Sequence, residues 1–373
     1  MNMADYHPCE SEVFGIENYS NLISSDTHLD DIKDHVIKEN SKIQYKDIIF
    51  DDMVSFQEVL QETSIDIKYI EIIGCIFAKD VFIDKEFDSL TLKNCCFEGK
   101  FYINSQYNNP SEAFKIDTLG IQDTKFHANF KLHNCEIKNF TLKDTDFEKN
   151  ADFFKSKFLT SKDIVFHAIN FRALALFGDT VFKEHLLFKY VTFGGYSHFR
   201  QAEFQKGLNL EYANIEKEMN FFGIKKLDEK ESIAKTTQET YRTVKYQLQK
   251  VGNIIDSNKY HALELEKKRQ KACDKSCKDW RFLADCLVLN IHKLSSSYST
   301  NWILALGWIF VIGIGFNFYL TQEFFSMNIF KYISFLTNKE DFSANYLAFV
   351  SNKVILGYLY YQFVTAIRKD TRK

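Results

Sequence analysis

The segment Thr180–Phe221, TVFKEHLLFKYVTFGGYSHFRQAEFQKGLNLEYANIEKEMNF, decides the fold. Large apolar residues recur in it every eleven residues, at Phe182, Phe193, Phe204 and Ile215. A second series falls between them, at Leu187, Phe199, Leu210 and Phe221. An amphipathic helix would instead repeat its apolar residues at i, i+3, i+4 and i+7. A step of five or six residues predicts a solenoid whose large apolar side chains point inward.

A small residue stands two positions before most of these apolar residues, at Thr180, Ser197, Ala202 and Ala213. The residue between them is usually polar, so we expect it to face solvent. The same triplet recurs from Ile72 onward, as in Thr124-Lys125-Phe126 and Thr145-Asp146-Phe147. Four such steps close one coil of about 20–22 residues, and successive coils pair like strands about 4.8 Å apart. Stability is then a sum over neighbouring coils.

These triplets resemble the motif of the pentapeptide-repeat family, most closely its Phe-rich variant in which steps of five and six alternate. The resemblance covers residues 72–222 and implies a right-handed quadrilateral β-helix. Two stretches depart from it: Asn104–Ala113 (NSQYNNPSEA) predicts a loop, and residues 160–178 fall out of register. The fold class expected is therefore mainly β, a pentapeptide-repeat solenoid, followed by α-helices and two transmembrane helices.

The expected domain order has four parts. Residues 1–70 form an N-terminal cap that covers the open end of the stack, with a short helix at Asp30–Lys38 and another around Val54–Leu60. Residues 71–223 form the β-helix, residues 224–295 a helical linker domain, and residues 296–373 the transmembrane region.

The linker has helical apolar spacing at Tyr241, Val244, Leu248 and Val251, which predicts a helix that ends at Gly252-Asn253. Asp256-Ser257 is expected to begin a second helix. This pair resembles the helical segment that follows pentapeptide repeats in membrane-anchored bacterial proteins. Trp280–Leu294 then places its apolar residues on one face. Two interpretations stay open for it, a core helix and a helix lying on a membrane surface.

Trp302–Leu320 is a run of nineteen residues without charge, which predicts a transmembrane helix. Tyr346–Ile367 predicts a second span, although it contains Lys353 and Gln362. Four Lys or Arg residues follow within 368–373, which favours a cytoplasmic C-terminus. The expectation is an integral protein of the inner (cytoplasmic) membrane with both termini in the cytoplasm.

Eight cysteines occur without a secretory signal at Met1–Cys9, so reduced, cytosolic thiols are expected. Cys75, Cys95 and Cys135 occupy the small position of the triplet, which predicts buried apolar side chains. Cys273 and Cys277 are four residues apart and could share a metal, but no His or third Cys stands at suitable spacing. No metal, cofactor-binding or catalytic residue is predicted.

Three hypotheses of function follow. The first is a membrane-anchored scaffold that presents the β-helix to an unknown cytosolic protein; a homo-oligomer is left open. The second is a channel-like or transport-associated protein, because two spans flanking Phe324–Leu336 resemble a two-helix pore module. Residues 321–345 contain no Gly, however, whereas potassium filters use Gly-rich runs.

The third hypothesis is a DNA mimic that binds topoisomerases, as some pentapeptide-repeat proteins do. Mimicry needs a strongly negative surface. Residues 71–222 contain 21 Asp or Glu and 19 Lys or Arg, which argues against it. The whole-chain net charge of −3 also argues against a nucleic-acid partner. An enzyme is not expected, since phosphate-binding glycine loops, metalloprotease motifs and nucleophile elbows are absent from the sequence.

Overall fold

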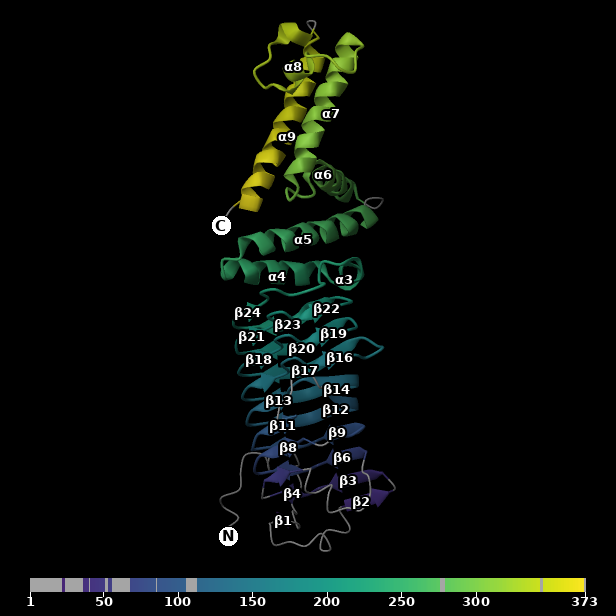
Figure 1. The fold of residues 1–373 in the computed structure, drawn as a ribbon, viewed down its shortest axis with the longest axis vertical. Helices are drawn as coiled ribbons and strands as arrows, with labels where there is room; N and C mark the ends of the chain where they lie inside the picture. The colour runs from purple at the N-terminus through teal and green to yellow at the C-terminus, as the bar shows by residue number, and fades with distance from the viewer. Residues whose placement is uncertain are drawn as a thin grey trace. The chain divides into compact units, whose positions relative to one another are not determined.

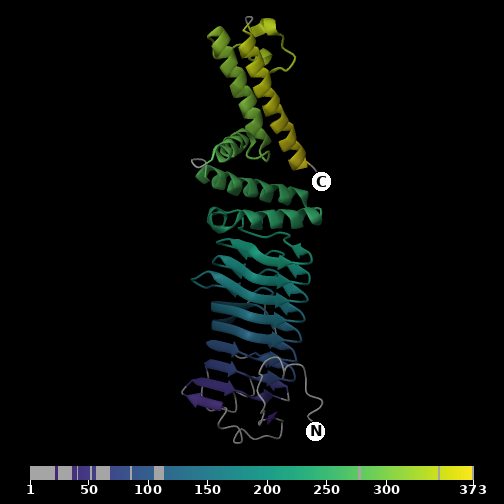
Figure 2. The ribbon, with the colours of Figure 1, turned by 180° about the vertical axis from the view of Figure 1, so that it is seen from behind.

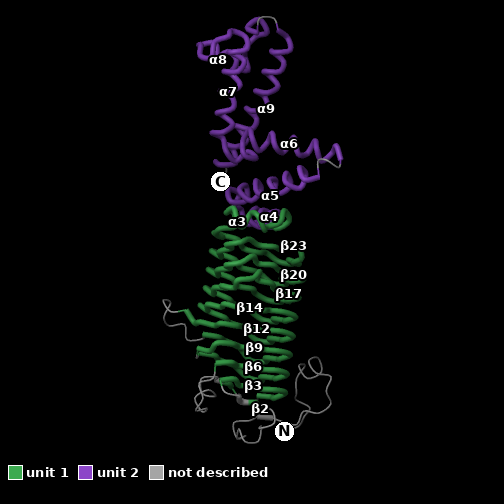
Figure 3. Tube along the Cα trace, turned by 90° about the vertical axis from the view of Figure 1, so that its right-hand side faces the viewer, with its two compact units in different colours: residues 1–240 green, residues 241–373 purple. Residues whose placement is uncertain are grey.

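The computed structural model describes residues 22–23, 36–39, 41–50, 53–55, 68–84, 86–104, 113–275, 279–342 and 345–371. The chain forms two compact units, residues 1–240 and residues 241–373 (Figure 3). The first unit is a parallel β-solenoid that ends in a short helix, and the second is helical (Figure 1).

Two sheets make up the solenoid, and their strands run in the same direction from coil to coil (Figure 2). The larger sheet contains β1 (Leu22–Ile23), β2 (Val36–Glu39), β3 (Lys42–Lys46), β4 (Ile49–Phe50), β6 (Tyr69–Ile73), β7 (Ile76–Phe77), β9 (Ser89–Lys93), β10 (Cys96–Phe97), β12 (Phe114–Phe126), β14 (Cys135–Phe147), β16 (Lys157–Phe158), β17 (Ile164–Phe171), β19 (Val181–Phe182), β20 (Leu186–Phe193), β22 (Glu203–Phe204) and β23 (Leu208–Ile215). The smaller sheet contains β5 (Val54–Ser55), β8 (Val81–Ile83), β11 (Phe101–Ile103), β13 (Phe130–Leu132), β15 (Ala151–Asp152), β18 (Ala175–Leu176), β21 (Ser197–His198) and β24 (Met219–Asn220).

The pairing register explains the eleven-residue repeat. Phe182 pairs with Phe204, and Phe171 pairs with Phe193, each 22 residues further along the chain. Residues that are 22 apart in the sequence therefore stack on the same side of successive coils. Phe193, which lies eleven residues after Phe182, belongs to a different column of paired residues, together with Phe171. The parallel β-solenoid is confirmed, whereas its right-handed, quadrilateral form stays a prediction.

Phe rings fill the interior of the solenoid. One column runs through successive coils with neighbouring ring centroids 4.5–5.4 Å apart: Phe50, Phe77, Phe97, Phe126, Phe147, Phe171 and Phe193. The rings of Phe97, Phe171 and Phe193 are almost completely buried. Burying one such side chain stabilises the fold by roughly 1.5–3 kcal/mol, so each coil is stable only against its neighbours.

The small residue of the triplet has a second role besides fitting the core. The hydroxyls of Thr124 and Thr145 each donate to a backbone carbonyl two residues earlier, at 2.8 Å. The thiol of Cys95 does the same to the Lys93 carbonyl at 3.2 Å. Cys75, Cys95 and Cys135 are fully buried, which confirms the sequence prediction for them. Burial also raises the pKa of Cys95 to about 12, so this thiol stays protonated at neutral pH.

The expectation that Leu187 faces the interior of the solenoid is wrong. Leu187 is half-buried, whereas Phe188 is buried, because β20 alternates and its neighbours Leu186 and Phe188 face inward. Residues 160–178 do shift the register, as expected: the offset between coils grows from 21 residues at Phe158 to 24 at Phe166. The strands β17 and β18 nevertheless continue the two sheets through this stretch.

The expected helix at Asp30–Lys38 is also wrong where it can be tested, because Val36–Glu39 is the strand β2, antiparallel to β3. Val54, expected to be helical, begins the strand β5. Parallel pairing already joins β3 to β6 and β4 to β7, so coils stack before residue 71. Residues 30–35, 56–67 and 105–112, which include the rest of the two helices and most of the expected loop, lie outside the described residues.

Helix α3 (Lys230–Lys235) and the residues after it close the C-terminal end of the solenoid. The Ser232 hydroxyl donates to the Phe204 carbonyl at 2.6 Å. The hydroxyls of Thr236 and Thr240 accept from the backbone N–H groups of Leu208 and Leu210, at 3.2 and 2.9 Å. An exposed strand edge would leave these groups unpaired and ready to bind another chain. Three side chains spaced four residues apart therefore cap the edge.

The remaining helices are α4 (Gln238–Lys250), α5 (Ile254–Lys275), α6 (Trp280–Ser296), α7 (Trp302–Thr321), α8 (Ile329–Ile333), the 3-10 helix η3 (Lys339–Phe342) and α9 (Tyr346–Thr371). The helical pair α4 and α5 is confirmed. Val251 is nevertheless exposed, and α5 begins at Ile254, with the Asn253 side chain accepting from the Asp256 N–H at 3.3 Å. The expected start at Asp256-Ser257 is therefore two residues late.

Candidate functional site

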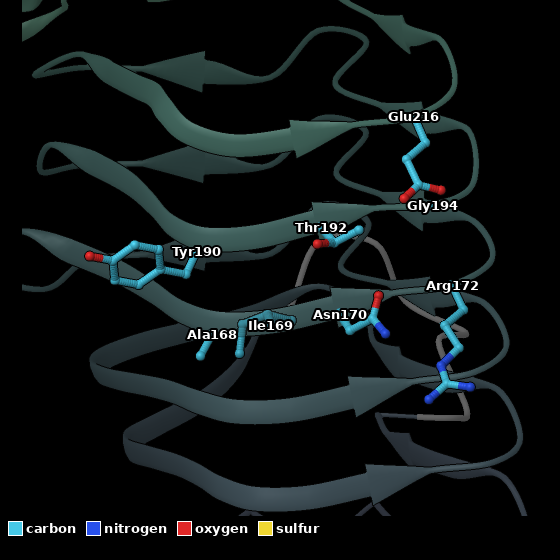
Figure 4. Close-up of a pocket in the computed structure, with 8 residues that line it drawn as sticks. All are labelled: Ala168, Ile169, Asn170, Arg172, Tyr190, Thr192, Gly194 and Glu216. Atoms are coloured by element: carbon cyan, nitrogen blue, oxygen red, sulfur yellow. The ribbon is translucent and has the colours of Figure 1, made fainter.

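A groove of about 560 Å³ opens on the outer surface of the solenoid, across β17, β20 and the end of β23 (Figure 4). Tyr190 lies at one end, and Arg172 and Glu216 lie at the other. Phe171, Phe193 and Ile215 pair with one another in successive coils. The residues that follow them are Arg172, Gly194 and Glu216, so Gly194 lies in the coil between those of the two charged residues. The missing side chain at Gly194 leaves room between the two charged residues.

Aromatic side chains form a column along the Tyr190 end of this groove. The Tyr190 and Tyr212 rings lie 6.1 Å apart, and the His167 ring meets Tyr190 edge-on at 5.8 Å. Lys189 places its ammonium 5.6 Å from the Tyr190 ring. Tyr190 and Tyr212 are more than half exposed, although their ring contacts resemble those of a buried core. Exposed Tyr beside Arg is the composition found at the energetic centres of protein–protein interfaces.

The backbone at this corner departs from the pattern of earlier coils. Asn94, Asp123 and Asp144 turn the chain there with φ near 50°, a left-handed conformation that Asn and Asp tolerate. In the next two coils the same corner is formed by Ala168 and Tyr190, with φ of 53° and 59°. A large residue held in this conformation costs free energy and points to a functional reason for its presence.

The charged end of the groove is held by ion pairs. Arg172 Nε donates to Asp146 Oδ1 at 3.1 Å, and its Nη1 lies 3.7 Å from Glu148 Oε1. Glu148 also pairs with His127 Nδ1 at 3.0 Å. The Glu216 carboxylate accepts from Asn214 Nδ2 at 3.3 Å. The groove thus offers a fixed cation and a carboxylate on either side of Gly194, suited to recognition of a polar partner surface.

A second groove, of about 570 Å³, opens over the smaller sheet at Gly178. Phe154, Gly178 and Arg200 each precede a left-handed corner residue in successive coils. The side chains of Phe154 and His198 lie against Gly178, where a Cβ would come 3.3 Å from the Phe154 ring. His198 lines this groove and is half-buried. Burial and the nearby Arg200 lower the pKa of His198, so its imidazole is neutral at pH 7.

Three cysteines contradict the expectation of reduced thiols. Cys273 of α5 is joined to Cys286 of α6 by a disulfide, and Cys96 is also disulfide-bonded. Cys273 therefore cannot share a metal with Cys277, which lies outside the described residues. Cys96, Glu98 and His127 come within 4.8 Å of one another, but the bonded sulfur of Cys96 is not available as a thiolate ligand.

Helix α7 is long and apolar enough to cross a membrane, and no other helix of the described residues meets that standard. Its 20 residues extend about 30 Å, the thickness of a bilayer core. The second expected span, Tyr346–Ile367, lies in α9, which carries Asn352, Lys353 and Gln362 in its length. One candidate span is therefore seen where the sequence predicted two.

Comparison with known proteins gives no family for this chain. No family model matches its sequence. No similar protein is found among curated proteins, and no similar structure is found among solved structures.

No site residue was predicted from the sequence, and neither groove was expected. A signal for them was present: Gly178 and Gly194 interrupt columns that carry larger outward residues in neighbouring coils, and Tyr190 replaces the Asp of earlier corners. The capping residues Ser232 of α3, Thr236 after its end and Thr240 of α4 were not predicted either, although they recur every four residues.

Proposed function

We propose that this chain is a membrane-anchored scaffold whose solenoid binds a protein partner on its outer surface and performs no catalysis itself. The observation that carries the proposal is the difference between the residues inside the solenoid and those on its outer surface. The interior is occupied by stacked Phe rings, whereas the described outer surface carries polar residues interrupted by the column Tyr190 and Tyr212. A filled interior leaves recognition to the outside of the coils.

The groove at Gly194 is the contact surface that we propose. Tyr190 supplies a large, rigid apolar area at low entropic cost, and Arg172 is already held in place by Asp146. The partner would insert a side chain beside Gly194 and cover the two tyrosines. The outer surface shows no strong excess of either charge in the repeat segment, which supports a protein rather than a nucleic acid as partner.

The anchor that we propose consists of α7 and α9. The polar groups of α9 turn toward neighbouring helices: Gln362 Oε1 accepts from the hydroxyls of Ser296 and Ser299 at 2.9 and 2.6 Å, and Asn352 Nδ2 donates to the Tyr332 carbonyl at 3.0 Å. Its exposed positions include apolar residues that suit lipid: Leu347, Val350, Val354, Ile355 and Val364. A helix that turns its polar residues toward neighbouring helices rather than toward lipid can lie in a bilayer.

Affinity purification from detergent-solubilised membranes tests the partner surface. The double variant Tyr190→Asn/Tyr212→Ser removes both rings and places a residue that favours the left-handed corner at 190. A protein that co-purifies with the intact chain is expected to be lost with this variant. It should be retained with Tyr69→Ser, a matched change at an exposed Tyr in an early coil. Equal recovery with both variants would contradict the proposed surface.

The side of the membrane that carries the solenoid follows, in this proposal, from the four basic residues within 368–373, which favour the cytoplasm. The Cys273–Cys286 disulfide opposes that orientation, because disulfides persist mainly in oxidising compartments. Protease treatment of sealed inner-membrane vesicles of both orientations decides between the two. Cleavage within the solenoid only when the cytoplasmic face is outward would support the proposal.

A channel-like protein is the second candidate, supported by the layout between the two long helices. Helix α8 packs against α7, where a Cβ at Gly313 would come within 2.5 Å of the Ile333 side chain. Asn317 and Asn352 are completely buried nearby. Ion flux through liposomes containing the intact chain would favour this candidate over the scaffold.

A further inference from the structure

Helix α6 carries its apolar residues on the outside. At 100° per residue, its exposed apolar side chains fall within an arc of about 140°. They are Trp280, Leu283, Ala284, Leu287, Val288, Ile291 and Leu294. Trp280 is 74% exposed and Leu294 is 63% exposed. A helix in a water-soluble protein would turn this face toward the core, so its exposure calls for an occupant.

The opposite face of α6 is already covered by α5. The Cys273–Cys286 disulfide joins the two helices, and Asn290 accepts from Arg269 Nη1 at 3.2 Å. Lys293 Nζ binds Glu266 Oε1 at 3.0 Å. These links hold α6 in one rotation about its axis, so the helix is not free to turn its apolar face toward α5.

The apolar face continues into the candidate span. Five residues separate α6 from α7, and Trp308 Nε1 of α7 donates to the Leu294 carbonyl of α6 at 2.8 Å. Within the helical unit, α6 runs across the direction of α7 and α9, and α5 lies on its other side (Figure 3). These links to α5 leave the apolar face of α6 turned away from α5. In the ribbon of Figure 1, α7 and α9 extend on the side of α6 opposite to α5.

We propose that α6 lies in the plane of the membrane interface, with its apolar face among the acyl chains at the surface of the bilayer that α7 crosses. Such helices bury their apolar face about 5–10 Å into the boundary between headgroups and chains. Trp280, Trp302 and Trp308 suit this depth, because Trp is enriched at membrane interfaces. The inference rests on the proposed membrane anchor, and the experiment below separates the two.

Depth-dependent quenching by brominated lipids provides the test, using the full chain in phosphatidylcholine vesicles. The chain has three Trp residues, so Trp302→Phe/Trp308→Phe leaves only Trp280 and Trp280→Phe/Trp302→Phe leaves only Trp308. A control with all three replaced by Phe and Lys268→Trp reports from an exposed position on α5. We expect bromine near the headgroups to remove most of the Trp280 emission, and the same lipids to leave the residue 268 control unchanged.

Further variants sharpen the result. Leu287→Glu should abolish the quenching of Trp280, whereas Asp285→Glu, a change on the polar side of the same helix, should leave it intact. Quenching of Trp308 without quenching of Trp280 would overturn the inference and leave the anchor standing. Absence of quenching at both positions would overturn the anchor itself. Shielding of Trp280 from aqueous quenchers without lipid quenching, together with cross-linking between Leu287→Cys copies, would show that a second copy covers the face and would also overturn the inference.

Discussion

The solenoid buries its large apolar side chains, whereas the helical unit exposes many of them. Phe126 and Phe147 of the solenoid are about 1% exposed and stack at 5.0 Å. In the helical unit, Phe325 is 81% exposed and Leu336 is 92% exposed. The hydrophobic effect opposes such exposure in water but not in lipid. The contrast supports the proposal that the helical unit anchors the chain in a membrane.

The hydrogen bonds of buried polar side chains also differ between the two units: they are local in the solenoid and join separate helices in the helical unit. In the solenoid, the hydroxyls of Thr124 and Thr145 bind backbone carbonyls two residues away, so each serves its own corner. In the helical unit, Gln362 joins α9 to the end of α6 and the loop after it, and Asn352 joins α9 to α8. In the second unit, polar contacts between helices accompany apolar ones, such as the cluster of Ile309 in α7 with Leu356 in α9.

The largest effect is expected from a charge in the aromatic stack. Phe204→Asp places a carboxylate where Phe182 stacks at 5.6 Å and water is absent. Loss of the ring alone costs about 3–5 kcal/mol, and an unpaired buried charge adds to it. Thermal unfolding followed by circular dichroism in detergent should show loss of the folded solenoid. The matched control is Phe222→Asp, because Phe222 is about half exposed and should tolerate the charge.

Unchanged melting of the Phe204→Asp variant would contradict the inward placement of this ring. A partial loss, confined to the last coils, would instead measure how far one coil depends on the next.

A smaller effect is expected at the capped edge. Thr240→Val keeps the shape of the side chain but removes the oxygen that accepts from the Leu210 N–H. A buried N–H left without a partner costs about 1–3 kcal/mol. The variant should melt at a lower temperature than the intact chain, and Thr243→Val, a half-exposed position on the same helix, should not. Equal melting of both variants would show that the hydroxyl does not cap the edge.

The smallest effect is expected from acid in the helical unit. Burial alone would raise the pKa of Glu266, but hydrogen bonds from Arg269, Tyr298 and Lys293 outweigh it and lower the pKa to about 2. A lowered folded-state pKa contributes stability above the ordinary value near 4.5, and this stability is lost as pH falls toward about 2. Melting of the detergent-solubilised chain between these pH values should reveal the loss. The Glu266→Gln variant should show a weaker pH dependence, and an identical one would contradict the assignment.

The repeat was predictable because its period is imposed by geometry. Inward residues must recur every coil, so Phe182, Phe193 and Phe204 identify the solenoid from spacing alone. Leu187 was misassigned because Leu186, Leu187 and Phe188 are all apolar, and only strand alternation decides which of them faces inward.

Other features depend on contacts that spacing does not carry. The Cys273–Cys286 disulfide requires α5 and α6 to lie side by side, which neither segment predicts by itself. The exposure of the apolar face of α6 could not be predicted from its sequence, because it depends on α5 covering the opposite face. The two grooves could not be predicted either, because they depend on how successive coils align and so place Gly178 and Gly194 between larger residues.

Alkaline extraction of membranes from cells that produce the intact chain tests the membrane-anchored scaffold most directly. Alkaline buffer releases proteins attached to the surface and leaves those that span the bilayer in place. We expect the chain to stay in the membrane pellet and to be released only by detergent, with its solenoid still folded. Recovery of the folded chain in the soluble fraction without detergent would contradict the account.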